Sequence, residues 1–341
     1  MIFRSRAPLR LGLAGGGTDV SPFCDLHGGY VLNATIDRYA YAVIESLEQN
    51  RVEFNATDLG VHTSLAVLPE YPLDGELNIH KAVYNYFIRQ HHHRNPLPLK
   101  LSTFSDAPVG SGLGSSSTLV VAMVKAFSEF LNIGMDDYAI ANLAYRIERI
   151  DCGLKGGRQD QYSATFGGFN FMEFYREDNT LVNPLRIRPE VINELESSLL
   201  LYFTGLSRES ANIIADQSNN VVQGNTTAIE AMHLLKQEAV WMKECLLRND
   251  FTGFVESMKS GWEAKKKSAK TVSNPVIDEI FNAALEAGAL AGKVSGAGGG
   301  GFMLFFVPVE HRMAVIRRLQ AFQGQVSNCH FTKTGAQAWK I

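Results

Sequence analysis

A run of alternating glycines followed by three serines constrains this chain more than any other feature. It reads Ala107-Pro108-Val109-Gly110-Ser111-Gly112-Leu113-Gly114-Ser115-Ser116-Ser117, and the apolar residues 119–124 follow directly. This order predicts a glycine-rich turn that opens a buried helix. Glycines let backbone N–H groups converge on one point, where the helix N-terminus adds partial positive charge. Such a turn binds a phosphate, and the serine hydroxyls can ligate a divalent cation on that phosphate.

Other interpretations of the glycine clusters fit less well. A flexible linker would not lie between an apolar strand-like run and an apolar helix. The P-loop pattern is absent, because no lysine follows Gly114. An earlier cluster, Gly15-Gly16-Gly17, follows a strand-like run, and Asp37 lies where a dinucleotide site would place its acidic residue. Its spacing is not GxGxxG, and Pro22 interrupts the expected helix, so the dinucleotide interpretation is weak.

Length, charge and cysteine content narrow the class of protein. A chain of 341 residues, 45% hydrophobic and 20% charged, favours a soluble globular protein with two packed domains. The net charge of −3 creates no field that would attract nucleic acid or an anionic membrane. Four separate cysteines with no CxxC pair predict reduced thiols, without a disulfide framework or a zinc site. Residues 1–6 lack a signal-peptide core, and the longest apolar run, 302–309, cannot span a bilayer, so we expect a cytoplasmic protein.

Hydrophobic periodicity predicts alternating strands and helices in both halves of the chain. Strands are expected over residues 4–14, 30–34, 39–46, 51–55, 99–104, 199–203, 292–295, 302–307 and 325–331. The strand over 51–55 should close an antiparallel meander, and 162–175 should form strands interrupted at Gly167-Gly168. Helices are expected over residues 76–90, from the glycine turn to about 131, and over 136–150, 226–248, 250–268, 275–287 and 309–322. Residues 176–190 look like a seam between two α+β domains, 1–185 and 186–341.

Glu148 and Asp160 are the acidic residues that we consider together. Glu148 lies near the end of a predicted amphipathic helix, and Asp160 follows a loop rich in glycine and basic residues, 153–158. In one interpretation Glu148 is a solvated helix residue and Asp160 only caps a turn. In the other, a metal ligand and a catalytic acid meet in one cleft. Spacing alone leaves both interpretations open.

Two further stretches are expected to differ, one facing a bound phosphate and the other facing solvent. Ser295 to Gly301 contains four consecutive glycines between apolar strands. This indicates that a ligand or another segment approaches the backbone closely here. A second phosphate-facing turn is the favoured interpretation. Lys265-Lys266-Lys267 is expected to form a solvated helix face, with contact to an anionic substrate as the alternative.

Three glycine clusters in this order, with an aspartate between the second and the third, resemble the GHMP kinases. The matching motifs are Arg6-Ala7-Pro8-Leu9-Arg10 with Gly15-Gly16-Gly17-Thr18-Asp19, then Pro108 to Ser116, then Lys293 to Gly299. The resemblance spans nearly the whole chain. It implies a two-domain fold, with an N-terminal domain like ribosomal protein S5 domain 2, including its rare left-handed crossover, and a ferredoxin-like C-terminal domain.

Within this superfamily the chain is most similar to sugar kinases of the D-glycero-D-manno-heptose 7-phosphate kinase type. Residues 6–19, 28–39, 157–162 and 204–208 carry this similarity. A mevalonate-type enzyme would usually have lysine where Arg10 stands. The resemblance implies an ATP- and Mg²⁺-dependent kinase that phosphorylates the anomeric hydroxyl of the heptose 7-phosphate, giving the 1,7-bisphosphate for nucleotide-activated heptose synthesis.

The resemblance also implies roles for residues at matching positions. ATP phosphates would be wrapped by Pro108, Gly110, Ser111, Gly112, Leu113, Gly114, Ser115, Ser116 and Ser117. Ser116 and Glu148 would hold Mg²⁺, Asp160 would orient the attacking hydroxyl, and Arg10 would offset charge on the phosphoryl group. Sugar and phosphoryl contacts would come from Gly17, Thr18, Asp19, Gly296, Ala297 and Gly298.

A phosphorylated acceptor also needs cations. Lys155 and Arg158 precede Asp160, and Arg208 follows a family-like turn, so these three are the candidates for the acceptor's own phosphate. Each could equally serve a structural ion pair.

Two other functions remain compatible with the sequence. One is a kinase of the same superfamily that acts on a free sugar such as fucose. The other is a non-catalytic sugar and ATP sensor on the same fold, although the presence of Ser116, Glu148 and Asp160 favours an enzyme. The expected partners are therefore ATP and a small sugar phosphate; the sequence does not fix the oligomeric state and leaves a homodimer open.

Overall fold

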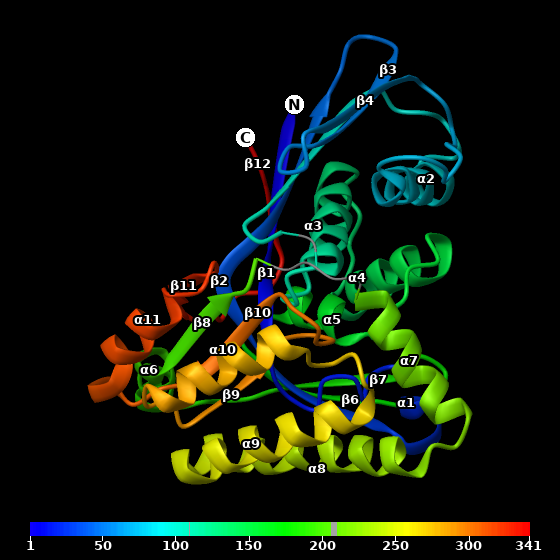
Figure 1. The fold of residues 1–341 in the computed structure, drawn as a ribbon. Coiled ribbons are helices and arrows are strands. Elements are labelled where there is room, and N and C mark those ends of the chain that lie inside the picture. Colours follow the sequence, from blue (N-terminus) through cyan, green and yellow to red (C-terminus); the bar gives the residue numbers. More distant parts are fainter. Residues whose placement is uncertain (109, 206–209) are drawn as a thin grey trace.

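The computed structural model describes residues 1–108, 110–205 and 210–341, whose strands form two sheets (Figure 1). The first sheet contains β1 (Ile2–Ala14), β2 (Gly29–Ser46), β3 (Arg51–Ala56), β4 (Val61–Ala66), β5 (Leu99–Ser105), β6 (Phe169–Phe174), β7 (Thr180–Pro184) and β12 (Gln337–Lys340). Its main path runs β12-β1-β2-β5-β3-β4, and β6 joins β2 and β7. The second sheet has the order β11-β8-β10-β9 and contains β8 (Leu199–Phe203), β9 (Ala291–Val294), β10 (Phe302–Phe306) and β11 (Gln325–Asn328).

Helices pack against both sheets. Those of the first half are α1 (Phe23–His27), α2 (Asn78–His91), α3 (Ser115–Phe130), α4 (Asp137–Tyr145), the π-helical η1 (Arg146–Asp151) and α5 (Gln159–Phe166). Those of the second half are α6 (Pro189–Ser198), α7 (Ser210–Val222), α8 (Thr226–Arg248), α9 (Phe251–Ser268), α10 (Pro275–Glu286), the 3₁₀ turn η2 (Val309–His311) and α11 (Arg312–Leu319). In Figure 1, α8 and α9 lie side by side at the base of the molecule, and both contact β1. The predicted α+β class is confirmed.

The order of strands in the first sheet differs from the predicted meander. Residues 30–34 and 39–46 belong to one long strand, β2. β3 pairs in parallel with β5, and β5 lies between β3 and β2. The meander prediction assumed that consecutive strands pair with each other. Here α2, whose apolar face is buried, lies between β4 and β5 in the chain, and β5 then enters the sheet beside β2.

Residues 159–166 form α5, so the strand predicted from Tyr162 onward begins only at Phe169. The aromatic and β-branched residues of this stretch favour a strand by propensity. Tertiary packing overrides that preference, because α5 is surrounded by α3, α4 and β1 and nearly all its residues are buried. As a result Asp160 lies in the first turn of a helix instead of in a loop.

The two halves of the chain share one buried core. A single cluster includes Leu9 of β1, Leu201 of β8, Met242 of α8 and Phe254 of α9. β12, from the second half, also pairs with β1 at the edge of the first sheet. The domain boundary near residue 185 stays a prediction.

The second and third glycine clusters pack directly against each other. The N–H of Phe302 donates to the carbonyl of Ser111 at 2.8 Å, and the Ser295 hydroxyl donates to the carbonyl of Gly112 at 2.9 Å. Gly112 has a φ of +81°, and a Cβ there would lie 2.4 Å from the Ser295 carbonyl oxygen. Close contact between the two backbones therefore accounts for glycine at this position.

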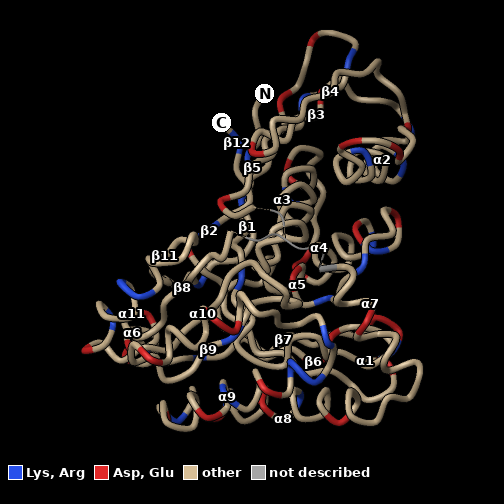
Figure 2. Tube along the Cα trace, viewed as in Figure 1, with Lys and Arg blue, Asp and Glu red and all other residues tan. Residues whose placement is uncertain are grey.

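Both signs of charge occur along the outer helices α8 and α9 (Figure 2). All four cysteines are free thiols. Among the described helices, none is both long enough and apolar enough to cross a membrane.

The contact between the glycine clusters predicts that Gly112→Ala destabilises the fold by about 2 kcal/mol or more, because a Cβ meets both steric overlap and a positive φ. Gly134→Ala is the matched control, since a Cβ there has no described heavy atom within 4 Å and its φ is not positive. Urea unfolding of both variants measures the difference. Equal unfolding midpoints would contradict this account of Gly112.

Candidate active site

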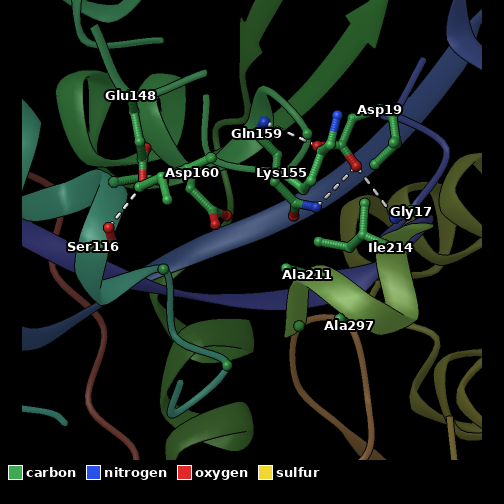
Figure 3. Close-up of a pocket in the computed structure, with 18 of the residues that line it drawn as sticks. Gly17, Asp19, Ser116, Glu148, Lys155, Gln159, Asp160, Ala211, Ile214 and Ala297 are labelled. Carbon is green, nitrogen blue, oxygen red and sulfur yellow. Dashed lines mark hydrogen bonds between the residues drawn. The ribbon is translucent and has the colours of Figure 1, made fainter. Parts of the chain in front are cut away.

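A cleft of about 490 Å³ lies where the glycine clusters, β1, α5 and α7 meet. Its lining comes from both halves of the chain and includes Asp19, Ser116, Asp160, Ile214 and Ala297 (Figure 3). The second and third glycine clusters form one wall, and α7 forms another. The shared core described above holds these walls in place.

Arg10 and Asp160 form the ion pair at the centre of this cleft. The Arg10 Nε donates to Asp160 Oδ1 at 2.7 Å, and Nη2 completes the ion pair. A third bond runs from Arg10 Nη1 to the carbonyl of Gly112 at 2.7 Å. Arg10 stands on β1 where its register with β2 shifts, an irregularity of the kind that reorients side chains near functional sites. The pair therefore links the substrate side of the cleft to the glycine-rich turn.

The three serines after the turn begin α3, and each hydroxyl has a defined partner. Ser115 bonds to Ser111, and Ser116 donates to Glu148 Oε1 at 2.8 Å (Figure 3). Ser117 accepts from Gln161 and Arg149. Ser116 is the only one of the three whose hydroxyl bonds directly to a carboxylate among the described contacts.

Glu148 is a buried carboxylate on the π-helical turn that follows α4. Its Oε2 accepts a bond from Gln161 at 2.7 Å, and its Oε1 lies 3.3 Å from Arg149 Nη1. π-helical turns are rare and occur often at functional sites, because they reorient the side chains they carry. A helix was predicted here as far as Ile150, and in the structure its last turn is π-helical.

The Ser116 and Glu148 pair fits the magnesium site that the sequence implied. Mg²⁺ prefers hard oxygen ligands and is often bound by one or two protein oxygens together with substrate phosphates. A buried carboxylate and a hydroxyl at 2.8 Å, beside a glycine-rich turn, supply such a donor set. Both side chains line the cleft.

Asp19 is held rigidly at the opposite end of the cleft. Its carboxylate accepts bonds from the N–H of Gly17 at 3.2 Å and from the backbone and side-chain nitrogens of Gln159, each at 3.0 Å (Figure 3). Gly157 packs against this carboxylate, where a Cβ would overlap it. Asp19 is therefore placed by the start of α5 and the loop before it, and its carboxylate can accept hydrogen bonds from hydroxyl groups.

The prediction that Lys265 belongs to a solvated helix face is wrong. Lys265 is 6% exposed, lines the cleft, and donates to the carbonyl of Gly16 at 2.6 Å. Burial lowers its pKa to about 8, with Asp19 partly opposing the shift. Lys293 of β9 behaves similarly: it donates to the carbonyls of Gly12 and Leu13, and desolvation lowers its pKa to about 7. Lys266 and Lys267 stay at least partly exposed, as expected.

Most of the predicted site residues line the cleft. These are Arg10, Gly17, Asp19, Gly110, Gly112, Gly114, Ser115, Ser116, Ser117, Glu148, Lys155, Asp160, Gly296 and Ala297. Of the others, Ser111 and Leu113 are buried, Pro108 and Gly298 are outside the lining, and Thr18 bonds to the backbone of Gly15 and Tyr30. Arg208 lies outside the described residues.

Arg158 has the structural role that the sequence left open. Its guanidinium bonds to the carbonyl of Tyr175 at 2.8 Å and forms ion pairs with Asp25 and Asp178. The side chain is 4% exposed and does not line the cleft. This placement favours the ion-pair interpretation over contact with the acceptor.

Sequence reasoning missed several cleft residues. Arg149, Gln159 and Gln217 line the cleft, and α7, which contributes one wall, was not predicted. Lys265 could have been found, because Val255, Met258 and Trp262 precede it at spacings of three and four and are all buried. A lysine that continues such an apolar stripe faces the interior.

The lowered pKa of Lys265 predicts a pH-dependent stability. Above pH 8 the folded chain releases this proton, whereas the unfolded chain keeps it up to the ordinary pKa of 10.5. The unfolded state then binds more protons, so the free energy of unfolding, measured relative to Lys265→Met, rises by about 1 kcal/mol from pH 7 to pH 9. Urea unfolding at both pH values measures this, with exposed Lys259→Met as the control. A difference independent of pH would contradict the shifted pKa.

Comparison with known proteins identifies the family. The model of the GHMP kinase N-terminal domain matches residues 78–168, and that of the GHMP kinase C-terminal domain matches residues 242–324. A D-glycero-alpha-D-manno-heptose 7-phosphate kinase of Campylobacter jejuni is 45% identical over 338 residues, which cover 99% of each chain.

Solved structures agree with this assignment. A D-glycero-D-manno-heptose 1-phosphate kinase of Bacteroides thetaiotaomicron is 45% identical, covers 99% of each chain and superposes with a TM-score of 0.85. The galactokinase of Lactococcus lactis, solved with galactose, shares the fold at 18% identity, with a TM-score of 0.77 over 98% of this chain and 95% of its own. The predicted family is thus confirmed: this chain belongs to the GHMP kinases.

Proposed function

We propose that this chain transfers the γ-phosphoryl group of ATP to the anomeric hydroxyl of D-glycero-D-manno-heptose 7-phosphate, giving the 1,7-bisphosphate. The observation that carries the proposal is the Arg10–Asp160 pair, bonded to Gly112 of the glycine-rich turn. This geometry supports the proposal, because it brings the Asp160 carboxylate close to the glycine-rich turn, over which a nucleotide's phosphates would bind. Phosphoryl transfer depends mainly on such positioning and on charge neutralisation.

ATP would bind with its phosphates over residues 110–117. Gly110, Gly112 and Gly114 line the cleft, and the N-terminus of α3 adds partial positive charge there. Ser116 and Glu148 would hold Mg²⁺, which would neutralise charge on the β- and γ-phosphate oxygens when it is bound. Gly296 and Ala297 line the cleft beside this turn and would lie next to the transferred phosphoryl group.

The transfer step assigns distinct roles to Asp160 and Arg10. Asp160 accepts a hydrogen bond from the O1 hydroxyl and takes its proton as O1 attacks the γ-phosphorus. A bond forms between O1 and phosphorus, the bond between phosphorus and the β,γ-bridging oxygen breaks, and ADP leaves. Arg10 keeps Asp160 oriented through two of its nitrogens, and its positive charge offsets charge on the phosphoryl oxygens.

Similarity supports the choice of acceptor. The Campylobacter relative is a heptose 7-phosphate kinase, and the Bacteroides structure is named as a heptose kinase as well. Asp19 lies in the same cleft as Asp160 and can accept hydrogen bonds from sugar hydroxyls. A sugar whose ring hydroxyls contact Asp19 would present one end to Asp160.

Comparing acceptors and identifying the product test the proposed function directly. We expect ATP- and Mg²⁺-dependent ADP release with D-glycero-D-manno-heptose 7-phosphate, and much less with fucose or galactose at the same concentration. Phosphorus NMR of the product should show a second phosphate coupled to the anomeric proton. Preferred use of a free sugar would replace the proposed acceptor, and no turnover with any sugar would favour the sensor interpretation.

Asp160→Asn should lower kcat by about 10²- to 10⁴-fold, because the amide keeps the shape of the carboxylate but cannot take the proton. ATP affinity, measured by titration calorimetry, should stay within a few-fold of the wild type. Asp25→Asn is a suitable control, because that carboxylate pairs with Arg158 outside the cleft. A kcat within a few-fold of wild type for Asp160→Asn would remove this residue from the proton transfer.

A further inference from the structure

A second cavity adjoins the cleft beyond Asp19. It measures about 320 Å³ and is bounded by the loop before α5, the start of η1 and one face of α7. Asp19, Val20, Arg149, Lys155 and Ile214 line both spaces, so the two are continuous. Ala215, Ser218 and Asn219 of α7 line only the second cavity. We call this space the side cavity.

Two cations stand at the boundary between the side cavity and the cleft. Lys155 is exposed, and within the part of the chain that the structure describes its ammonium group forms no ion pair. Arg149 has a side chain that is 12% exposed, and its buried Nε has no hydrogen-bond partner among the described residues. Gly156 packs so closely on this guanidinium that a Cβ would lie 2.3 Å from its central carbon.

Arg149 is fixed while part of its hydrogen-bonding capacity stays unused. Its Nη1 lies 3.3 Å from Glu148 Oε1. Nη2 donates to Ser117 at 3.1 Å, and Nη1 donates to the carbonyl of Lys155 at 3.3 Å. The second bond ties the Lys155 backbone to η1 and so brings both cations to one loop. An arginine anchored in this way and a free lysine nearby are the side chains that bind phosphate in proteins.

The opposite wall of the side cavity is neutral and polar. Ser218 donates to the carbonyl of Ser21 at 3.1 Å, which fixes α7 against the first half of the chain. Asn219 is exposed on the same face. Among the described residues, Asp19 is the one carboxylate on this lining, and its three N–H donors hold it at the boundary, where it suits sugar hydroxyls better than an anion.

The position of the side cavity separates it from the nucleotide. The glycine-rich turn, Ser116 and Asp160 line the cleft but not the side cavity, and Asp19 lies between the two regions. A sugar with its anomeric carbon at Asp160 and its ring at Asp19 would therefore point its far end into the side cavity. In a heptose 7-phosphate, that far end is the phosphate.

We propose that the side cavity is the subsite for the acceptor's own phosphate group, bound by Lys155 and Arg149 and enclosed by α7. This inference rests on the proposed function and names the residues that would distinguish a phosphorylated from a free sugar. Lys155 and Arg149 replace Arg158, which lines neither the cleft nor the side cavity. The acceptor phosphate would contact a wall from each half of the chain.

The test compares D-glycero-D-manno-heptose 7-phosphate with the unphosphorylated heptose in four variants. Lys155→Ala removes one cation, and Ala215→Glu places a carboxylate in the side cavity without touching the cleft lining. Each variant has a matched control. Lys259→Ala removes a partly exposed lysine on α9, and Val222→Glu adds a carboxylate at the exposed C-terminal residue of α7. Titration calorimetry with ATP checks that nucleotide binding is intact in each protein.

We expect the ratio of kcat/KM for the phosphorylated heptose to that for the free heptose to fall about tenfold or more in Lys155→Ala and in Ala215→Glu. The two controls should keep the wild-type ratio. Ratios within twofold of wild type in both test variants would overturn the subsite while leaving the proposed acceptor in place. A wild-type enzyme that prefers the free heptose would overturn the acceptor and the subsite together.

Discussion

The architecture of the cleft depends on contact between two glycine-rich stretches of the chain. Residues 110–114 and 295–302 meet so closely that the Phe302 N–H and the Ser295 hydroxyl donate to carbonyls of the turn, and a Cβ at Gly112 would overlap the Ser295 carbonyl. Because one stretch precedes α3 and the other joins β9 to β10, this contact fixes the turn from the first half against the sheet of the second. Arg10 joins the same junction through the carbonyl of Gly112.

Positive charge collects around this junction inside the protein. Burial lowers the pKa values of Lys265 and Lys293, the positive charge of Arg10 lowers both further, and Lys265 adds to the lowering at Lys293. Isolated cations are costly to bury unless they have partners. Here backbone carbonyls of Gly12, Leu13 and Gly16 accept the lysine hydrogens, and Asp19 and Asp160 supply opposite charge. A site kept cationic in this way is prepared for the multiple negative charges of nucleotide and sugar phosphates.

Much of the site could be predicted from the sequence, and the exceptions have physical reasons. Glycine patterns and local order predicted the turn that lines the cleft, and the position of Arg10 on a strand followed from alternation. The sequence left the role of Arg158 open and misplaced Lys265, because their surroundings come from segments far away in the chain: Asp25 and Tyr175 for Arg158, the loop at Gly16 for Lys265.

The same reasoning explains what was missed in the fold. Propensity could not show that α5 would be enclosed on nearly every side, or that β5 would lie between β2 and β3, since both follow from packing across the whole first half. The wall formed by α7 lacked a strong local signal, because its apolar residues alternate with asparagine, glutamine and serine.

The pairing of β12 with β1 has a consequence for how this chain acquires its structure. β1 is synthesised before β12, so this edge of β1 is covered only when residues 337–340 arrive. Until then, its unpaired N–H and C=O groups form an open edge on which other chains could add strands. Pairings between residues so distant in sequence also slow folding. A nascent chain that lacks residues 337–340 therefore leaves one edge of β1 open to pairing with other chains, on the side that β12 later covers.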